Sequence, residues 1–585
     1  MFRNLIFSIL LTGVSALLSA QLPPVFGPEY ATKASKSNLV KQYISPVKIT
    51  WLSDLTGKSI ENANSLMEPA NGQADLNTGK YFTMKSDNHT KPGIVLDFGK
   101  ELHGGIRLVT TIDDCNRHVK VRIRFGESVS EAMSDIGEKD ATNDHAMRDF
   151  VVELPWLGSL ETGNSGFRFV RIDLVDWNTS LVLKEVSASF IYRDIPYLGS
   201  FKSNDDQLNR IWLTGAYTVH LNMQEYLWDG IKRDRLVWVG DLNPEIMSIN
   251  NVFGYNEVVP KSLDLAREST PLPGWMNGIS SYSMWWILNH HNWYKYQGNL
   301  AYLQEQKDYM MKLLNQLMSK IDPSGSEKLD GGRFLDWPSS ENPEAVHAGL
   351  QSLMVMTMKA GAELCTVLKE PEMNKKCLEA IELLKKHVPP AGNSKQGAAL
   401  LALADLMPAE KADKEVLSVD GAQRMSTFYG YYMLQAMAKA GNYTGALNDI
   451  RTFWGAMLDL GATTFWEDFN LDWVKNASRI DEIVPEGKKD IHGDYGAYCY
   501  LGLRHSFCHG WASGPTSWLT EHVLGISVVD AGCKTLKIVP HLGDLQWAEG
   551  TFPTPAGVLW VRHEKQSDGS IKTVYKAPKG IKVLK

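Results

Sequence analysis

Between residues 40 and 195, apolar residues come in short runs whose length and alternation are typical of β-strands. Glycine, aspartate and asparagine separate the runs, as they do at turns. The clearest runs are residues 94–98, 119–125, 151–154 and 167–174. The pattern predicts an N-terminal antiparallel β-sandwich over residues 21–200, a fold that by itself specifies no function.

The period of the apolar residues changes near residue 205, where long helical patterns begin. Loops that contain glycine and proline separate the helices. The predicted helices are 206–226, 302–321, 351–368, 373–387, 398–406, 426–440, 443–460 and 515–524. Residues 201–525 have room for roughly a dozen helices, which predicts a toroid of paired helices, with a helical solenoid as the alternative.

Strand-like runs return after residue 525, at 535–539, 558–561 and 570–575. They predict a small C-terminal β-sandwich over residues 526–585. A chain of 585 residues is too long for one ordinary hydrophobic core, so a division into three domains agrees with its length.

The first 20 residues have the features of a signal peptide. Arg3 supplies the positive charge, residues 5–18 are almost wholly apolar, and Ser19 and Ala20 offer a cleavage site. The apolar stretch is short for a membrane span, and no cysteine for lipid attachment lies near the cleavage site. We therefore expect an exported protein, periplasmic or extracellular, with no membrane partner.

Charge and composition narrow the class of ligand. The formal net charge is −7 and no block of like charge stands out, so nothing indicates a nucleic-acid partner. Tryptophan is frequent, with 18 residues. Indole rings stack on the apolar faces of sugars, although tryptophan also fills helix interfaces.

None of the six cysteines has zinc-ligand spacing. They are Cys115, Cys365, Cys377, Cys499, Cys508 and Cys533. Export would permit pairing of Cys365 with Cys377 and of Cys499 with Cys508. Free buried thiols are the alternative.

The densest group of polar and aromatic residues is 228–241, a predicted loop that follows a helix. Its candidate functional residues are Asp229, Arg233, Asp234, Trp238 and Asp241. Carboxylates close to guanidinium groups suit the binding of hydroxyls and the holding of an acid with a shifted pKa. A surface loop of salt bridges is the alternative.

Three further groups combine a carboxylate or a histidine with tryptophan, and their candidate residues are Trp466 with Glu467, His509, and Asp336 with Trp337. The first group suits a sugar subsite or an acidic helix cap. The second suits the binding of a hydroxyl or a hydrogen-bonded core histidine, and the third suits the wall of a subsite. The aromatic run 282–296 predicts helix packing, with one or two side chains that reach the cavity.

The sequence lacks HExxH, GxSxG, GxxxxGK[ST] and GxGxxG, which argues against a metalloprotease, a serine hydrolase or a nucleotide-binding protein. The chemistry that the candidate residues can still support is acid and base catalysis by carboxylates. Cleavage of a glycosidic bond needs a carboxylic acid to protonate the leaving oxygen and a carboxylate to activate water or attack the sugar. This chemistry requires neither a metal nor an organic cofactor.

The same motifs resemble those of a known family. Residues 229–241, DGxxRDRxxWxGD, are similar to the signature of the bacterial α-L-rhamnosidases, glycoside hydrolase family 78. Residues 462–467 (ATTFWE) resemble its second signature and residues 508–511 (CHGW) its third, in the family's order. The resemblance spans nearly the whole mature chain. It implies an (α/α)6 barrel flanked by the two β-sandwich domains, an inverting mechanism, and a rhamnose-containing glycan as the partner.

The resemblance also implies roles for single residues. Glu467 takes the position of the general base, and Asp234 takes that of the general acid, where the family has glutamate. The side chain of aspartate is one methylene shorter, so either Asp234 acts with an adjusted geometry, or Asp229 or Asp241 takes its role, or the activity is altered. The residues that match the family's sugar-binding positions are Asp229, Arg233, Trp238, Asp241 and His509. In an inverting pair we expect the two carboxyl groups to be roughly 6.5–9.5 Å apart.

The alternatives are another enzyme in the same barrel, a non-catalytic glycan-binding protein, and a purely structural surface protein, against which the clustered tryptophan and acid motifs argue. A polysaccharide lyase in the same fold would use tyrosine and histidine, here Tyr429, His347 and His509, and would release an ultraviolet-absorbing product. A hydrolase for another sugar is possible in the same barrel. A non-catalytic glycan-binding protein would bind rhamnosides without turnover, and the aspartate at the acid position gives this class some weight.

Overall fold

The computed structural model describes residues 37–69, 71–76, 79–112 and 117–585. The predicted signal peptide and Cys115 lie outside these residues. All features reported below lie in one compact unit, Leu39–Lys585. Within the described ranges, no helix is both long enough and apolar enough to cross a membrane.

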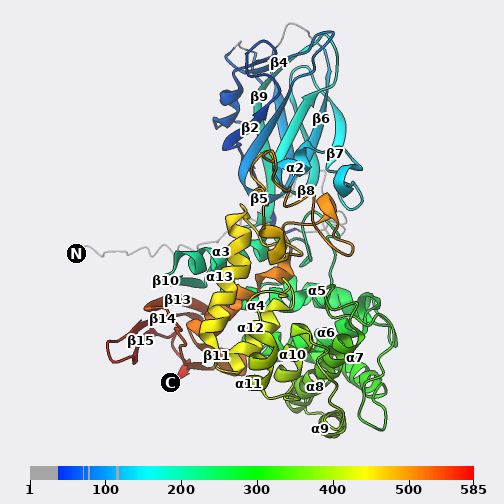
Figure 1. Ribbon diagram of the computed structural model, residues 1–585, viewed down its shortest axis with the longest axis vertical. Helices are drawn as coiled ribbons and strands as arrows, with labels where there is room; N and C mark the ends of the chain where they lie inside the picture. Colours follow the sequence, from blue (N-terminus) through cyan, green and yellow to red (C-terminus); the bar gives the residue numbers. More distant parts are fainter. Residues whose placement is uncertain (1–36, 70, 77–78, 113–116) are drawn as a thin grey trace, which may run out of the picture. The chain divides into compact units, whose positions relative to one another are not determined.

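Nine strands form one antiparallel sheet in the N-terminal part of the chain (Figure 1). They are β1 (Leu39–Ile44), β2 (Lys48–Leu52), β3 (Ile60–Glu61), β4 (Phe82–Lys85), β5 (Gly93–Thr110), β6 (Val119–Gly126), β7 (Asp149–Leu154), β8 (Ser159–Leu174) and β9 (Ser180–Arg193). Their order is β3-β4-β9-β5-β8-β6-β7, with β1 paired to β9 and β2 paired to β5. The four strands predicted here are confirmed, because each predicted run lies within β5, β6, β7 or β8.

The end of β6 places two acids that matter for the site. The short helix α2 (Val129–Met133) follows β6, and its first turn is capped by the Ser128 side chain, which accepts the Glu131 N–H. The Glu127 N–H donates to Glu131 Oε2 at 2.8 Å. The Glu131 carboxylate is thus fixed next to Glu127 at the end of β6.

The region from Asp206 to Val523 is helical. Its helices are α3 (Asp206–Asn222), α4 (Leu242–Val252), α5 (Val258–Glu268), α6 (Ser280–Gln297), α7 (Leu300–Met318), α8 (Pro343–Leu368), α9 (Pro371–Leu384), α10 (Lys395–Leu403), α11 (Ala409–Ala412), α12 (Gly430–Lys439), α13 (Tyr443–Asp459) and α14 (Gly514–Trp518). Each of the eight predicted helices overlaps one of these. The last prediction also covers Leu519–Val523, which continues α14 as a π-helical turn.

Three of these helices were not predicted: α4, α5 and the four-residue α11. In α4 all eleven residues are buried, including polar ones such as Asn243, Glu245 and Asn250, so its polar positions do not mark a solvent-exposed face. Helix α5 begins with Val-Val-Pro, a start that is more typical of a strand interrupted by proline. Tertiary packing therefore decides α4 and α5.

Two small sheets complete the fold. Their strands are β10 (Ser200–Ser203), β11 (Ile526–Asp530), β12 (Thr535–Ile538), β13 (Trp547–Thr554), β14 (Gly557–Lys565), β15 (Ile571–Lys576) and β16 (Lys582–Leu584). One sheet has the order β10-β13-β14-β15 and the other β11-β12-β16. The three strands predicted here are confirmed as β12, β14 and β15. One pair departs from the predicted antiparallel arrangement, because β12 and β16 run parallel.

The cysteines of the described residues, Cys365, Cys377, Cys499, Cys508 and Cys533, carry free thiols. The structure therefore shows the free-thiol alternative for these five residues. The Cys365 and Cys377 thiols nevertheless touch, and hydrogen bonding to Cys377 raises the pKa of Cys365.

Candidate active site

The loop that joins α3 to α4 carries the first group of candidate residues. Asp229 folds the loop on itself, because its Oδ1 accepts the Leu236 N–H at 2.9 Å. The loop is also joined to the segment that contains His509. Gly230 and His509 form a β-bridge, and the Gly510 N–H donates to the Asp229 carbonyl at 2.8 Å. The structure thus brings two motifs together that lie far apart in the sequence.

Three buried carboxylates surround the imidazole of His509. Its Nε2 lies 3.7 Å from Asp229 Oδ2, 3.8 Å from Asp241 Oδ2 and 3.5 Å from Glu467 Oε1. Each of these four residues is about 2% exposed. The distances exceed those of good hydrogen bonds, so the imidazole lies among the three carboxylates without a strong hydrogen bond from Nε2 to any of them.

Burial sets the protonation of this group. Desolvation, with a contribution from Arg233, lowers the pKa of His509 well below its ordinary range, so the imidazole is neutral. Desolvation and the neighbouring acids raise the pKa of Asp229 well above its ordinary value. Desolvation likewise raises the pKa of Asp241, although the Tyr282 hydroxyl, which donates to Asp241 Oδ1 at 2.9 Å, opposes the shift. The pocket therefore holds acids with strongly shifted pKa values, a common property of active sites.

Glu467 lies in the segment after α13 and pairs with Arg233. An Arg233 Nη2–H donates to Glu467 Oε1 in a short contact, and the Ser506 N–H donates to Oε2 at 3.2 Å. Burial raises the pKa of Glu467, while the charge and hydrogen bond of Arg233 lower it. The pair therefore favours the ionised form that a general base needs.

Asp234 lies on the other side of the same guanidinium group. Its Oδ1 is 3.8 Å from Arg233 Nη1, and its Oδ2 accepts the Trp238 indole N–H at 3.0 Å. The side chain is 18% exposed, against 2% for Glu467. Asp234 adopts a left-handed backbone conformation with φ of 53°, which turns the chain at the tip of the loop.

Two predicted sugar-binding residues serve the packing instead. Trp466 is 1% exposed and stacks on Phe507 at 4.1 Å, so its ring face is not open to a sugar. Asp336 is 2% exposed, and its carboxylate accepts hydrogen bonds from Ser339, Gln396 and Ser426. Both side chains are thus engaged by other residues of the protein.

Trp337 stands in a wall of aromatic rings. Its ring lies 5.9 Å from the rings of both Tyr498 and Tyr500. Tyr500 in turn lies under the Arg233 guanidinium at 4.8 Å. Tyr498 and Asp468 line an adjoining cavity of about 340 Å³.

Sequence reasoning missed four residues at this site. Tyr500 and His145, whose Nε2 is 3.4 Å from Asp234 Oδ1, stand in loops without a motif. Tyr282 belongs to the aromatic run that predicted one or two side chains reaching the cavity. Glu245 is fully buried, and neither of its carboxylate oxygens has a hydrogen-bond partner among the described residues. It follows the first motif by four residues, but nothing in the sequence places it beneath the pocket.

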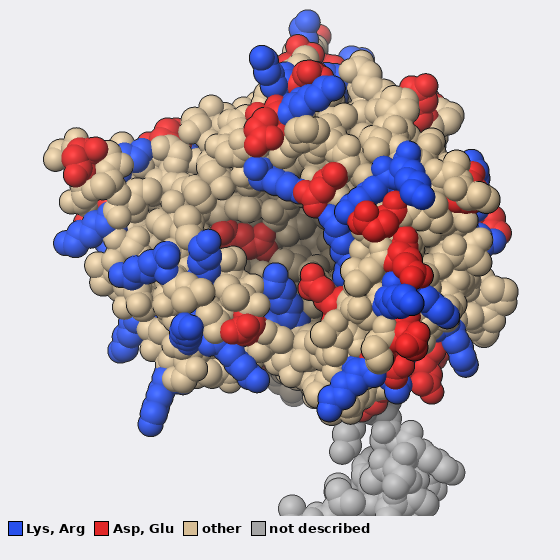
Figure 2. Space-filling view, turned by 90° about the horizontal axis from the view of Figure 1, so that it is seen from below, with Lys and Arg blue, Asp and Glu red and all other residues tan. Residues whose placement is uncertain are grey.

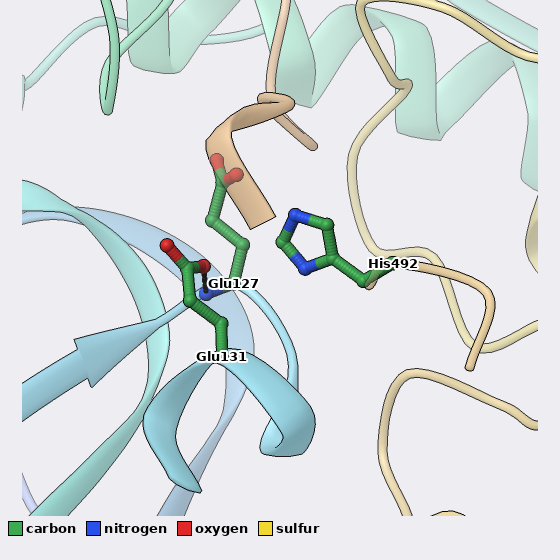
Figure 3. A group of neighbouring side chains, drawn as sticks. All are labelled: Glu127, Glu131 and His492. Carbon is green, nitrogen blue, oxygen red and sulfur yellow. Dashed lines mark hydrogen bonds between the residues drawn. The ribbon is translucent and has the colours of Figure 1, made fainter. Parts of the chain in front are cut away.

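One group in the described residues has the geometry of a possible metal site. The ligand atoms of Glu127, Glu131 and His492 lie within 4.8 Å of one another (Figure 3). The Lys232 ammonium already contacts both carboxylates, at 3.0 and 3.2 Å. Both nitrogens of His492 are also engaged, with Ser128 Oγ at 2.7 Å and the His505 carbonyl at 2.9 Å. The cluster therefore holds a lysine in the place that a cation would take.

A second hollow does not involve the candidate residues. A cavity of about 660 Å³ is lined by side chains of α6, α8, α12 and the start of β11, among them Glu363, Lys359 and Gln435. The face of the molecule seen in Figure 2 is hollowed at its centre, with acidic and basic side chains around the hollow. None of the acids around His509 lines the 660 Å³ cavity.

Buried carboxylates gather around one guanidinium and one neutral imidazole in the helical domain, an arrangement compatible with chemistry by paired carboxylates. Residues 196–523, more than half of the chain, match the bacterial α-L-rhamnosidase six-hairpin glycosidase domain. The chain therefore belongs to this family, and the resemblance noted in the sequence is confirmed.

Individual relatives agree with this assignment. The chain is 23% identical over 559 residues to an α-L-rhamnosidase of Alteromonas sp. (strain LOR), a match that covers 86% of this chain and 57% of the relative. The fold of this chain is similar to that of a GH78 rhamnosidase of Bacillus sp. GL1, with a TM-score of 0.73 and 22% identity. The match covers 89% of this chain and 55% of the Bacillus chain. A rhamnosidase from Klebsiella oxytoca with rhamnose bound gives a TM-score of 0.63 at 19% identity, over 82% of this chain and 95% of that one. The chain thus spans a little over half the length of the first two relatives.

Proposed function

We propose that this protein is an inverting glycoside hydrolase that removes terminal α-L-rhamnose from a glycan or glycoside by acid/base catalysis. The family assignment supports the reaction class, and the relative from Klebsiella oxytoca has rhamnose bound. We further propose that the helical hairpins close into an (α/α)6 barrel around the site, as the six-hairpin description of the family implies.

The observation that carries the proposal is the position of Arg233 between two carboxylates. Its guanidinium pairs with Glu467 on one side and approaches Asp234 on the other. Contact of both carboxylates with one guanidinium is compatible with the roughly 6.5–9.5 Å separation of an inverting pair, which leaves room for a water molecule.

The two carboxylates have different surroundings, as an acid and a base require. Glu467 is buried and charge-paired, so it is the base that activates water. Asp234 is nearer to solvent and is the proton donor to the leaving oxygen. Asp229, Asp241 and the neutral His509 bind the hydroxyls of the sugar, while Trp238 and Trp337 form apolar walls.

The test is the release of rhamnose from p-nitrophenyl α-L-rhamnoside by the wild type and by Glu467→Ala and Asp234→Ala. We expect turnover by the wild type and its loss in both variants. Glu486→Ala, which changes an exposed acid in a neighbouring loop, is the control and should retain full activity. NMR of the first product should show the β-anomer.

Two outcomes would contradict the proposal. A wild type that turns over no rhamnoside is not a rhamnosidase. Full activity in Asp234→Ala would show that another acid gives the proton, and Asp229→Asn and Asp241→Asn would then identify it.

We also propose that the protein is exported. The support is the charged, apolar and small-residue pattern of residues 1–20. Sequencing of the protein recovered from the periplasm or medium should give an N-terminus at Gln21, whereas a chain retained in the cytoplasm with Met1 intact would refute export.

A further inference from the structure

A buried charged cluster joins the N-terminal sheet to the catalytic loop. Lys232, next to Arg233 in the loop, extends its ammonium group to Glu127 Oε2 at 3.0 Å and Glu131 Oε1 at 3.2 Å. The two acids follow β6 and lie in α2, so they belong to the sheet region. Their side chains are 0% and 1% exposed, and that of Lys232 is 8% exposed.

The same cluster holds a second segment, residues 503–507. Lys232 Nζ donates to the carbonyls of Leu503 and His505, at 3.1 and 2.6 Å. Glu127 Oε2 accepts the Phe507 N–H at 2.6 Å, and its Oε1 accepts the Ser506 hydroxyl at 3.4 Å. Glu127 therefore binds both the catalytic loop and the segment that leads to His509.

Each of these segments also contacts Glu467. Arg233, which follows Lys232, donates to Glu467 Oε1, and Ser506, which precedes Phe507, donates its N–H to Oε2. We propose that Glu127 is a positioning residue, which acts through Lys232 and residues 506–507 to hold Arg233 and Ser506 against the two oxygens of Glu467. The inference rests on the proposed function, since it assigns Glu467 the role of base.

The free energy needed to bury these charges supports a role for the cluster beyond stabilising the fold. A buried ion pair is often no more stabilising than well-packed apolar side chains in the same place. Two carboxylates here face one ammonium, and burial raises the pKa of Glu127 to about 7 against the opposing charge of Lys232. Such an arrangement holds two segments in one register, which apolar contacts do less specifically.

The test compares Glu127→Ala with Glu185→Ala, a control that removes another buried and paired carboxylate from the sheet region. Glu185, in β9, is also buried and pairs with Arg107 at 2.5 Å, and the structure gives it no contact with the site. Both Glu127→Ala and Glu185→Ala should lower the melting temperature. Only Glu127→Ala should lower kcat on the chromogenic rhamnoside, by about 100-fold with KM little changed, which is the scale of a small displacement of catalytic groups.

Further readouts separate positioning from folding. In Glu127→Ala the acidic limb of the pH profile of kcat should move to higher pH, because Arg233 no longer holds Glu467 ionised. Glu127→Gln keeps an oxygen for the Phe507 N–H, so it should recover part of kcat. Crystal structures of the wild type and Glu127→Ala should show Arg233 displaced from Glu467 in the variant.

Three results would overturn the inference. These are wild-type kcat and pH profile in Glu127→Ala, an equal loss of kcat in folded Glu185→Ala, and an undisturbed Arg233–Glu467 pair in the variant crystal. The crystallographic comparison needs no turnover, so it decides the inference even if the wild type releases no rhamnose and the proposed function fails.

Discussion

Replacement of Arg233 by glutamine should move the pH dependence of catalysis by an amount that the structure allows us to work out. The guanidinium gives Glu467 a charge-assisted hydrogen bond in a buried site. Such bonds contribute roughly 1.5–3 kcal/mol, and one pKa unit corresponds to about 1.4 kcal/mol. Without the cation, the pKa of Glu467, already raised by burial, should rise by about one to two further units.

The sign of the effect on rate and on stability follows from this shift. The base must be ionised, so the acidic limb of kcat/KM should move to higher pH by about one to two units. The folded-state pKa of Glu467 would then stand further above its unfolded value. The variant should therefore lose stability as the pH rises from the unfolded pKa to the folded pKa, and should regain it in acid.

The assay is a pH series of kcat/KM with the chromogenic rhamnoside, accompanied by thermal unfolding at each pH. Arg235→Gln is the matched control. Arg235 stands two residues further along the same loop and donates to the Asn164 carbonyl at 2.8 Å, without a contact to Glu467. An acidic limb that stays in place in Arg233→Gln, or that moves equally in Arg235→Gln, would refute the reasoning.

Two other residues give predictions of a different kind. Burial, with Asp241 and Asp229 nearby, raises the pKa of Glu245 well above its ordinary value, so the wild type should lose stability as the pH rises from about 4.3, the value expected in the unfolded chain. Glu245→Gln should therefore unfold at a higher temperature than the wild type at pH 8 but not at pH 4; the same difference at both would contradict the assignment. Trp238→Phe keeps an aromatic ring, although a smaller one, and removes the N–H donated to Asp234. We expect kcat/KM to fall about tenfold or more, whereas unchanged kinetics would show that the hydrogen bond does not serve the acid.

Sequence patterns predicted elements such as β8 and α3 from the period of their apolar residues. The run 167–174 lies inside β8, and the helix predicted from residue 206 begins there because Asp205 caps it, with Oδ1 accepting the N–H groups of Gln207 and Leu208. Helix α4 escaped prediction because it is buried on every side. Strand β10 also escaped prediction, and its partner β13 lies far along the chain.

The residues of the site also fall into two sets: those that a sequence motif marks and those that only the tertiary fold brings together. Asp229, Arg233 and Asp241 were predicted because one loop carries them together. Glu127 and Tyr500 reach the same place only through the tertiary fold, from segments without any motif. Trp466 shows the opposite failure, because its neighbourhood to Glu467 suggested a sugar platform while its ring is buried against Phe507.

The pairing of β10 with β13 has a consequence for synthesis of the chain. The Ser200 and Thr551 hydroxyls meet across this pair although 351 residues separate them. At about 5–20 residues per second, roughly 20–70 s pass between the appearance of the two strands at the ribosome. During that time β10 has an open edge, the kind of edge on which other strands can add, and the helical domain begins from a strand whose partner is made only after that domain.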